Sequence, residues 1–294
     1  MRPVLELPDA RGALPFGAAP PPPPPPQPDL TASALTLTNV TSTGATANFT
    51  INNVGTDVAG ASTANLYLSA DATITTTDTV LGSFATPSLA ASGSSSETIA
   101  FSSSLSAQVT AGTYYIGAFA DSLNVVAESN EGNNASNAVP IILGTTGADT
   151  LNGTSANDIM FGFDGGDTLY GAGGSDTMIG GIGADHFLYK ARTDGSSGGD
   201  RIVDFLSGSD VLDFSRGAFG NHLAMSGGNT GTLAATHFEV NTTGTATKTS
   251  AEFIYDSAHN TLYYDSNGSG AGGHYLIAHF DGTVTLSNSD IHIV

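Results

Sequence analysis

Five nine-residue repeats follow one another without interruption from Gly144 to Leu188. In order they read GTTGADTLN, GTSANDIMF, GFDGGDTLY, GAGGSDTMI and GGIGADHFL. Each begins with glycine and has aspartate at its sixth position, and these aspartates are Asp149, Asp158, Asp167, Asp176 and Asp185. An apolar residue stands at the eighth position, and these residues are Leu151, Met160, Leu169, Met178 and Phe187. A flexible linker has no reason to keep apolar residues in phase, so the period predicts a stacked structure.

The two halves of each repeat predict different backbone structures. The glycine-rich first half predicts a turn, because glycine reaches conformations that aim several backbone carbonyls at one point. The second half, with one apolar residue between two others, predicts a minimal strand with one inward side chain. Turn, strand, turn and strand make one coil of a parallel β-roll, in which residues eighteen apart stack at about 4.8 Å.

This stacking places Asp149, Asp167 and Asp185 in one column and Asp158 and Asp176 in another. Carboxylates so close repel one another unless a cation lies between them. Carboxylate and carbonyl oxygens together suit Ca²⁺, which takes six to eight oxygen ligands at about 2.3–2.6 Å. The five repeats therefore predict about three or more Ca²⁺ ions, held between 149 and 167, between 158 and 176, and between 167 and 185.

The pattern resembles the RTX repeat, GGxGxDxUx, of calcium-binding secreted proteins, and the resemblance covers all five repeats. It implies that the aspartate and alternate turn carbonyls of one repeat, with those of the repeat two further on, enclose each ion. Besides the five aspartates, it assigns to calcium Gly144, Gly147, Gly162, Asp164, Gly165, Gly171, Gly173, Gly174, Gly181 and Gly183. The Asp158/Asp176 site departs from the family pattern, because Ala156 replaces the fourth-position glycine and Asn157 adds bulk.

Charge and composition exclude several classes of partner. The 294-residue chain has a formal net charge of −20, with no Lys or Arg between Arg11 and Lys190. No nucleic-acid partner is expected without a basic surface, and an anionic membrane surface is equally unfavourable. No stretch approaches 18 consecutive apolar residues, so no membrane insertion is expected. The absence of cysteine excludes disulfides and thiolate metal sites. A secreted fold would then need another stabilising element, and calcium can serve.

Residues 1–29 predict a proline-rich arm or linker. The run Pro20–Pro26 predicts a polyproline II helix, which is either a stiff spacer or a spacer carrying Val4–Leu7 as an extended arm. Such an arm could add a strand to the sheet edge of a neighbouring subunit. The N-terminus is acidic and proline-containing rather than basic and then apolar, so no Sec-type signal peptide is expected.

Residues 30–142 combine short β-prone stretches with frequent turn residues and predict an antiparallel β-sandwich. The expected strands are Leu35–Asn39, Ala45–Ile51, Asn65–Ser69, Val80–Phe84, Thr98–Phe101, Thr113–Ala120 and Val125–Glu128. The stretches PDL, YLSAD and GTYYIGAFADSLNVVAESNEGNN resemble the CARDB module, an immunoglobulin-like domain of prokaryotic surface proteins linked by name to cell adhesion. Asp121, Glu128 and Glu131 lie near a predicted hairpin, where they either hold a further cation or solvate a turn.

Residues 189–294 are expected to cap the roll, since the end of a solenoid needs a cap. The stretches DRIVDF and DVLDF resemble the segment after the repeats in serralysin-type proteases and other type I secretion substrates. Asp200 and Asp204 either complete the half-site left by the fourth repeat or border strands. FIYDSAHNTLYYDSNGSG predicts a hairpin, followed by strands near Tyr275–Phe280 and Thr283–Leu286. The tail SDIHIV is similar to the C-terminal export signals of that secretion class.

No catalytic site is expected, because HExxH, GxSxG and P-loop motifs are absent and the seven histidines are scattered. His274 and His279 could approach Asp256 or Asp265 across a hairpin, but such histidines are usually surface residues. The chain is therefore expected to be all-β: an N-terminal immunoglobulin-like β-sandwich (30–142), a short calcium-binding parallel β-roll (143–188) and a C-terminal β cap (189–294).

The expected function is that of a secreted, calcium-dependent structural or adhesive protein of the cell surface or extracellular matrix. Calcium is the expected ligand. The expected macromolecular partner is either the protein itself, assembled into fibres or a layer, or a surface or matrix component. Two alternatives stay open: a glycan-binding or enzyme-accessory module, and an extracellular hydrolase with an unrecognised site. The lack of tryptophan disfavours a glycan platform, and Tyr67, Tyr114 and Tyr115 fall in predicted strands.

Overall fold

The computed structural model describes residues 23–294, apart from residues 108, 196–197, 220–222, 224–229 and 251. Strands dominate this part of the chain, and its single α-helix, α1 (Arg216–Phe219), has four residues. The short 3-10 helices there are η1 (Ser103–Ala107), η2 (Ala235–His237) and η3 (Asn288–Asp290). No helix of the described residues is long and apolar enough to cross a membrane. The all-β prediction is confirmed, while the predicted arm Val4–Leu7 lies outside the described residues.

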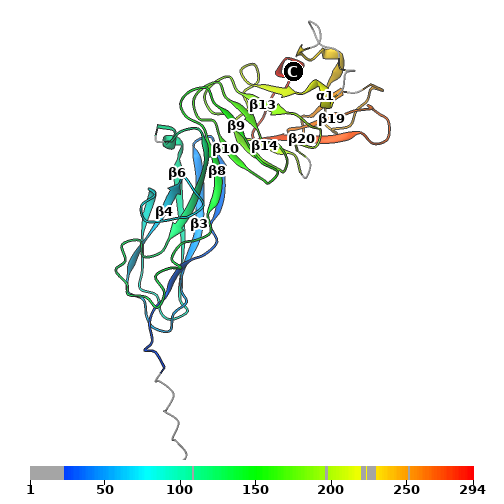
Figure 1. Ribbon diagram of the computed structural model, residues 1–294. Helices are drawn as coiled ribbons and strands as arrows, with labels where there is room; N and C mark the ends of the chain where they lie inside the picture. The colour runs from blue at the N-terminus through cyan, green and yellow to red at the C-terminus, as the bar shows by residue number, and fades with distance from the viewer. Residues whose placement is uncertain (1–22, 108, 196–197, 220–222, 224–229, 251) are drawn as a thin grey trace, which may run out of the picture.

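The first part of the chain forms a sandwich of two sheets, coloured blue to green in Figure 1. One sheet contains β1 (Leu30–Ala32), β2 (Thr36–Thr41), β3 (Gly44–Asn53) and β6 (Ser94–Ser102). The other contains β4 (Ser62–Ser69), β5 (Thr79–Thr86), β7 (Gly112–Phe119) and β8 (Val139–Leu143). Buried and half-buried residues alternate along β3, so Ala47, Phe49 and Ile51 face the core between the sheets.

Six of the seven strands predicted for the sandwich overlap the observed strands β2 to β7. The predicted strand Val125–Glu128 is wrong, because these residues form a loop. The Asp121 carboxylate accepts the backbone N–H groups of Val125 and Val126 at 3.1 and 2.7 Å, so two amides that a ladder would use are bound locally. The sequence pattern does not predict β1, which has three residues, or β8, which contains Pro140.

Strand β8 joins the sandwich to the roll. It pairs antiparallel with β7 of the sandwich. On its other side it pairs parallel with β10 (Ile159–Phe161), a strand of the second repeat. The sandwich sheet therefore continues without a break into one sheet of the roll, as an eleven-stranded sheet. The two parts share backbone hydrogen bonds as well as side-chain contacts, which fixes how they meet (Figure 1).

The repeats form a parallel β-roll with two sheets. One contains β9 (Thr150–Asn152), β11 (Thr168–Tyr170) and β13 (His186–Tyr189), and the other contains β10 and β12 (Thr177–Ile179). Leu169 pairs with Leu151 and Met178 with Met160, so residues eighteen apart stack as predicted. The eighth-position side chains are all buried in one core, because each strand turns its single apolar residue inward.

The C-terminal part extends both sheets of the roll. One sheet continues through β14 (Asp200–Ile202), β20 (His274–Phe280), β19 (Thr261–Asp265), β18 (Glu252–Asp256) and β17 (Phe238–Asn241). The other continues through β15 (Val211–Phe214), β21 (Ile291–Ile293) and β16 (Gly231–Thr232). The predicted hairpin is confirmed as β18–β19. The predicted strand Thr283–Leu286 is wrong: the Val284 carbonyl accepts the Tyr255 hydroxyl at 2.9 Å rather than a strand amide.

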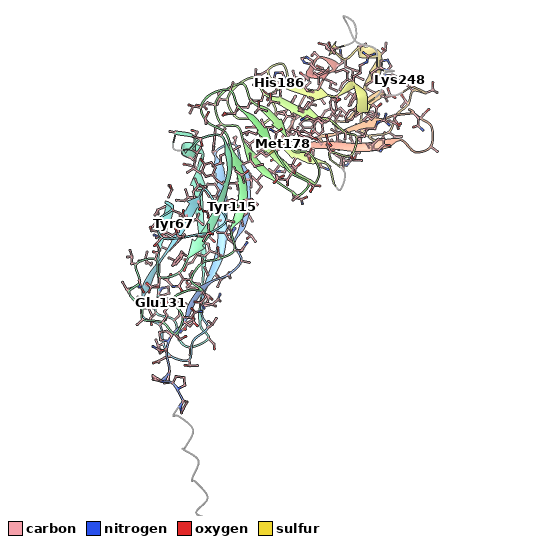
Figure 2. All side chains as sticks on the ribbon, viewed as in Figure 1. Tyr67, Tyr115, Glu131, Met178, His186 and Lys248 are labelled. Atoms are coloured by element: carbon pink, nitrogen blue, oxygen red, sulfur yellow. The ribbon has the colours of Figure 1, made fainter. Side chains whose placement is uncertain are left out.

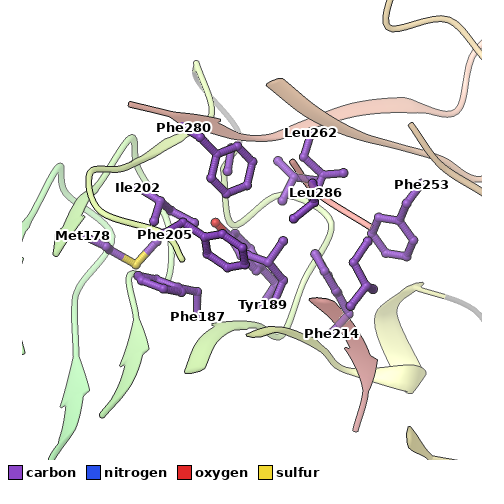
Figure 3. Packing of buried hydrophobic residues seen from close by; sticks show 14 of the residues in the cluster. Met178, Phe187, Tyr189, Ile202, Phe205, Phe214, Phe253, Leu262, Phe280 and Leu286 are labelled. Atoms are coloured by element: carbon purple, nitrogen blue, oxygen red, sulfur yellow. The ribbon is translucent and has the colours of Figure 1, made fainter. Parts of the chain in front are cut away.

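An aromatic core closes the open end of the roll (Figure 3). The ring centroids of Phe214 and Phe253 lie 4.5 Å apart, and those of Phe205 and Phe280 lie 5.3 Å apart. The ring centroids of Phe187, in the last repeat, and Phe205 lie 5.9 Å apart. The core of the repeats therefore continues into the C-terminal part. Burial of such large rings gives the short roll the apolar area that five repeats lack.

Candidate metal centre

The repeat aspartates form the two predicted columns. The Oδ1 atoms of Asp167 and Asp185 accept the backbone N–H groups of Asp149 and Asp167, at 2.8 and 2.9 Å. In the second column, Oδ1 of Asp176 accepts the N–H of Asp158 at 2.8 Å. Each bond joins residues eighteen apart in the sequence and adjacent in the stack. One carboxylate oxygen of each inner aspartate therefore has a protein donor.

The other oxygen, Oδ2, has a protein donor only in the first two repeats. Oδ2 of Asp149 accepts the backbone N–H of Thr145 at 2.6 Å and its hydroxyl at 2.9 Å. Oδ2 of Asp158 accepts the same two groups of Thr154, at the same distances. A threonine at the second position of the repeat thus binds the carboxylate of its own turn.

In the next three repeats the Oδ2 atom has no hydrogen-bond partner among the described residues. These aspartates are Asp167, Asp176 and Asp185, with 0, 1 and 0% of their surface exposed. A buried, ionised carboxylate oxygen without a donor is destabilising by more than the roughly 1–3 kcal/mol typical of a neutral group. A cation beside each of these three oxygens would supply the partner that the described residues do not.

Glycine keeps the space beside these oxygens open. A Cβ atom on Gly162 would lie 2.4 Å from Oδ2 of Asp167 and 2.4 Å from the carbonyl oxygen of Gly180. A Cβ atom on Gly171 would lie 2.1 Å from Oδ2 of Asp176. A carboxylate oxygen and a carbonyl oxygen of the next coil therefore border one small space. This donor set suits a hard cation such as Ca²⁺.

The other glycines assigned to calcium line the same turns. A Cβ atom on Gly144 would lie 2.5 Å from the carbonyl oxygen of Gly162. Gly165 and Gly174, at the fourth position, have φ of +132° and +124°, which residues with a side chain rarely adopt. Gly147, Gly173, Gly181 and Gly183 occupy the corresponding turns of their own repeats. Asp164 is exposed at the third position of its turn, and its charge adds to the rise in the pKa of the buried Asp167.

The electrostatics of these turns disfavour negative charge. Burial raises the pKa of Asp167 to about 6 and that of Asp176 to about 7, because the charged form is desolvated. The carboxylates of neighbouring turns raise both pKa values further, while backbone N–H groups lower them. A bound cation would reverse this balance and favour the ionised carboxylates.

The two aspartates predicted beyond the repeats have different roles. Oδ1 of Asp200 accepts the N–H of Asp176 at 3.0 Å and so extends the second column, and burial raises its pKa to about 8. Asp204 does not join a column: its two oxygens accept the N–H groups of Gly180 and Gly181, at 3.0 and 3.1 Å.

The sequence analysis missed Asp210, whose Oδ1 accepts the N–H of Asp185 at 3.1 Å and extends the first column. The spacing of Gly208, Asp210 and Leu212 repeats positions four, six and eight of the nonapeptide. That spacing is the sequence signal for Asp210.

Glu131 lies at the end of the sandwich that points away from the roll (Figure 2). Glu128 accepts the N–H of Leu30 at 2.5 Å, and Glu131 accepts the N–H of Glu128 at 2.9 Å. With Asp121 they bind backbone amides of this end of the sandwich, which fits the turn interpretation. No group of three or more His, Asp or Glu side chains among the described residues could hold a metal, so any ion in the repeats needs backbone carbonyls too.

The histidines considered for catalysis also bind backbone or neighbouring groups. His274 bonds to the carbonyl oxygen of Gly244 at 2.7 Å, and His279 bonds to Thr261 at 3.0 Å. His259, rather than either of these, contacts Asp256, at 2.7 Å. The predicted approach is therefore wrong for Asp256, whereas Asp265 is the cross-strand partner of His274 in the pairing of β19 with β20. In the described part of the chain, this hairpin offers no nucleophile activated by a histidine and a carboxylate.

Comparison with known proteins assigns the two regions to families. The CARDB family model matches residues 27–138, and the model of the RTX calcium-binding nonapeptide repeat matches residues 143–178 and 164–187. None of the curated proteins matches the chain.

Several solved structures resemble parts of the chain. The CARDB domain of a Pyrococcus furiosus protein in complex with di-metal ions is 21% identical, with a TM-score of 0.31; the match covers 40% of this chain and 88% of that one. A domain of a putative cell surface protein from Methanosarcina acetivorans is 27% identical, with a TM-score of 0.28 and coverages of 40 and 92%. The AlgE6R3 subunit of Azotobacter vinelandii mannuronan C5-epimerase is 24% identical, with a TM-score of 0.30 and coverages of 50 and 79%. The chain thus carries a CARDB domain followed by RTX calcium-binding nonapeptide repeats.

Proposed function

We propose that this is a secreted structural or adhesive protein of the cell surface or extracellular matrix, whose roll folds when calcium binds. The observation that carries the proposal is the set of three buried Oδ2 atoms without partners, on Asp167, Asp176 and Asp185. At neutral pH a cation would supply the partner that these oxygens lack among the described residues, and the RTX repeats are calcium-binding units.

In the proposed mechanism, the aspartates and the turn carbonyls bind the ion and hold consecutive coils at strand spacing. Calcium supplies the positive charge that cancels the repulsion within each column. Where calcium is scarce, the columns repel and the roll stays unfolded. At the near-millimolar calcium found outside cells, sites with dissociation constants of about 10⁻⁴–10⁻³ M would fill. Tenfold excess of calcium over the dissociation constant adds about 1.4 kcal/mol per independent site.

The shared sheet supports an architectural role for the whole molecule. Because β8 pairs with strands of both parts, folding of the roll fixes its orientation relative to the CARDB domain. The calcium-bound roll would then hold the CARDB domain in a fixed orientation. The domain would bind either a surface or matrix component or another copy of the protein. Export by a C-terminal signal and exchange of the N-terminal arm stay predictions.

The two alternative functions have less support. Tyr67 is 2% exposed and Tyr115 is half-buried, so these tyrosines do not form an exposed platform for a glycan. The matched families are not catalytic, and a screen for hydrolysis of esters, glycans and peptides would reveal a hydrolase as turnover.

A calcium titration tests the proposal. Circular dichroism and sedimentation velocity of the full chain, after chelation and then with added calcium, should show a cooperative gain of β structure and a more compact particle. Electron microscopy of the same samples would separate a monomeric binder from a self-assembling component. A calcium-free protein with unchanged spectrum, shape and melting temperature would refute the proposed role of the ion.

A further inference from the structure

The segment Phe205–Asp213, beyond the matched repeats, reproduces a repeat turn bond by bond. The N–H of Leu206 donates to Oδ2 of Asp210 at 2.7 Å, as that of Thr145 does to Asp149 at 2.6 Å. Oδ1 of Asp210 accepts the N–H of Asp185 at 3.1 Å, the bond that joins each pair of aspartates within the repeats. The segment therefore forms a sixth turn, beyond the residues that the repeat family model matches.

The strand that follows this turn is also in repeat register. Val211 pairs with His186 and Leu212 with Phe187, so Leu212 takes the place of the eighth-position residue and is fully buried. The N–H of Val211 donates to the carbonyl of Asp185 at 2.8 Å, as the N–H of His186 does to Asp167 at 2.7 Å. Gly208, in the fourth position of this turn, has a φ of +83°, as glycines there have positive φ in two of the repeats.

The fifth repeat, on which this sixth turn stacks, has a buried hydrogen-bond acceptor without a donor. Asp185 is 0% exposed, and its Oδ2 atom has no hydrogen-bond partner among the described residues. A Cβ atom on Gly180 would lie 2.4 Å from that oxygen, so the space beside it is kept open by the absence of a side chain. The same combination occurs at Asp167 and Gly162, inside the repeats.

We propose that Asp185 and Asp210 hold a further calcium ion, between the fifth repeat and the sixth turn. The inference rests on the proposed calcium function and adds a site that the nonapeptides alone do not contain. Asp185 would supply its free Oδ2 atom. Asp210, whose two oxygens accept the N–H groups of Leu206 and Asp185, would add the second negative charge beside the ion, and backbone carbonyls of the two turns would complete an all-oxygen donor set. The ion would join the repeats to the C-terminal part, so the cap itself becomes calcium-dependent.

Counting bound ions tests the site. Native mass spectrometry and equilibrium dialysis with calcium would be applied to the full chain, to Asp210→Asn and to Asp213→Asn. Asp213 lies three residues further along, where it contacts His186 at 2.7 Å on the other face of the strand, so its variant removes the same charge without touching the site. Asp210→Asn should bind one ion fewer than the full chain, and Asp213→Asn should bind the same number.

The outcomes separate this inference from the calcium function as a whole. If the full chain binds several ions and Asp210→Asn binds as many, the sixth-turn site is wrong while the repeat sites stand. If the full chain binds none, the proposed function fails. Should Asp210→Asn not fold, crystals of the unaltered protein grown with calcium decide the matter through anomalous scattering. A peak beside Oδ2 of Asp185, between Asp185 and Asp210, supports the site, and peaks confined to the repeats refute it.

Discussion

The hydroxyl of Thr145 donates to Oδ2 of Asp149 at 2.9 Å, so the first turn of the roll satisfies its carboxylate without an ion. Thr154 does the same for Asp158 in the second turn. The third and fourth turns carry Phe163 and Ala172 at this position, with φ of +76° and +69°. A β-branched threonine disfavours that conformation, so the first two turns are built differently from the later ones. We therefore expect the end of the roll nearest the sandwich to depend least on calcium.

Replacing Thr145 by valine removes the hydroxyl and keeps the branched shape of the side chain. Asp149 then loses one of its two donors on Oδ2, and the free energy of unfolding should fall by about 1–2 kcal/mol. Urea denaturation at a fixed calcium concentration measures the change. Thr150→Val, at an exposed strand position, is the control and should stay within about 0.5 kcal/mol of the unaltered protein. Equal losses in both variants would contradict the role of the hydroxyl.

Replacing Gly171 by alanine should weaken calcium binding about tenfold, because the new methyl group would lie 2.1 Å from Oδ2 of Asp176. Gly173→Ala is a matched control in the same turn: it keeps the backbone carbonyl that the family resemblance assigns to calcium, and the new Cβ atom meets nothing closer than 3.8 Å. Isothermal titration calorimetry of the two variants measures the difference. Similar affinities in both would show that the space beside Asp176 does not hold the ion.

Replacing Asp167 by alanine should raise the calcium midpoint of folding more than replacing Asp149, by about tenfold. Asp167 serves two proposed sites, with Asp149 on one side and Asp185 on the other, and its Oδ2 atom has no protein donor among the described residues. Asp149 serves one site and already has Thr145 as a donor. Calcium titrations followed by circular dichroism compare the two variants, and equal midpoints would refute the sharing of Asp167.

The stability of the calcium-free protein should fall as pH rises from 5 to about 8. The folded protein raises the pKa of Asp167 to about 6, of Asp176 to about 7 and of Asp200 to about 8, from 3.8. Folding therefore takes up protons, and this stabilisation is complete below pH 3.8 and lost as pH rises through the folded values.

Calcium needs the ionised carboxylates, so the gain in melting temperature on adding calcium should increase over the same pH range. Thermal denaturation at several pH values, with calcium removed by dialysis and then restored, measures both effects. A calcium-induced gain that does not change between pH 5 and 8 would contradict the burial of the ligands.

Much of the roll could be predicted from the sequence, because a fixed period imposes a fixed geometry. Once Leu151 and Leu169 occupy the same place in successive coils, the aspartates of their repeats must stack too. The hairpin β18–β19 was also predictable, from β-prone residues on either side of a polar turn. Val125–Glu128 has the residue types of a strand but forms a loop, because the Asp121 carboxylate binds its amides. Such a contact is invisible to a pattern of single residues.

The sequence by itself determined that the chain contains a stacked, acidic, glycine-lined spiral, since apolar phase and aspartate spacing are local properties that repeat. Only the tertiary structure decided which carboxylates still need a cation, because that depends on whether a hydroxyl, an amide or nothing lies beside each oxygen. It also decided that β8 serves both the sandwich and the roll, and that Asp210 continues a column after an insertion of seven residues beyond the eighteen-residue spacing. Those relationships arise from backbone pairing between segments whose separation no longer follows the period.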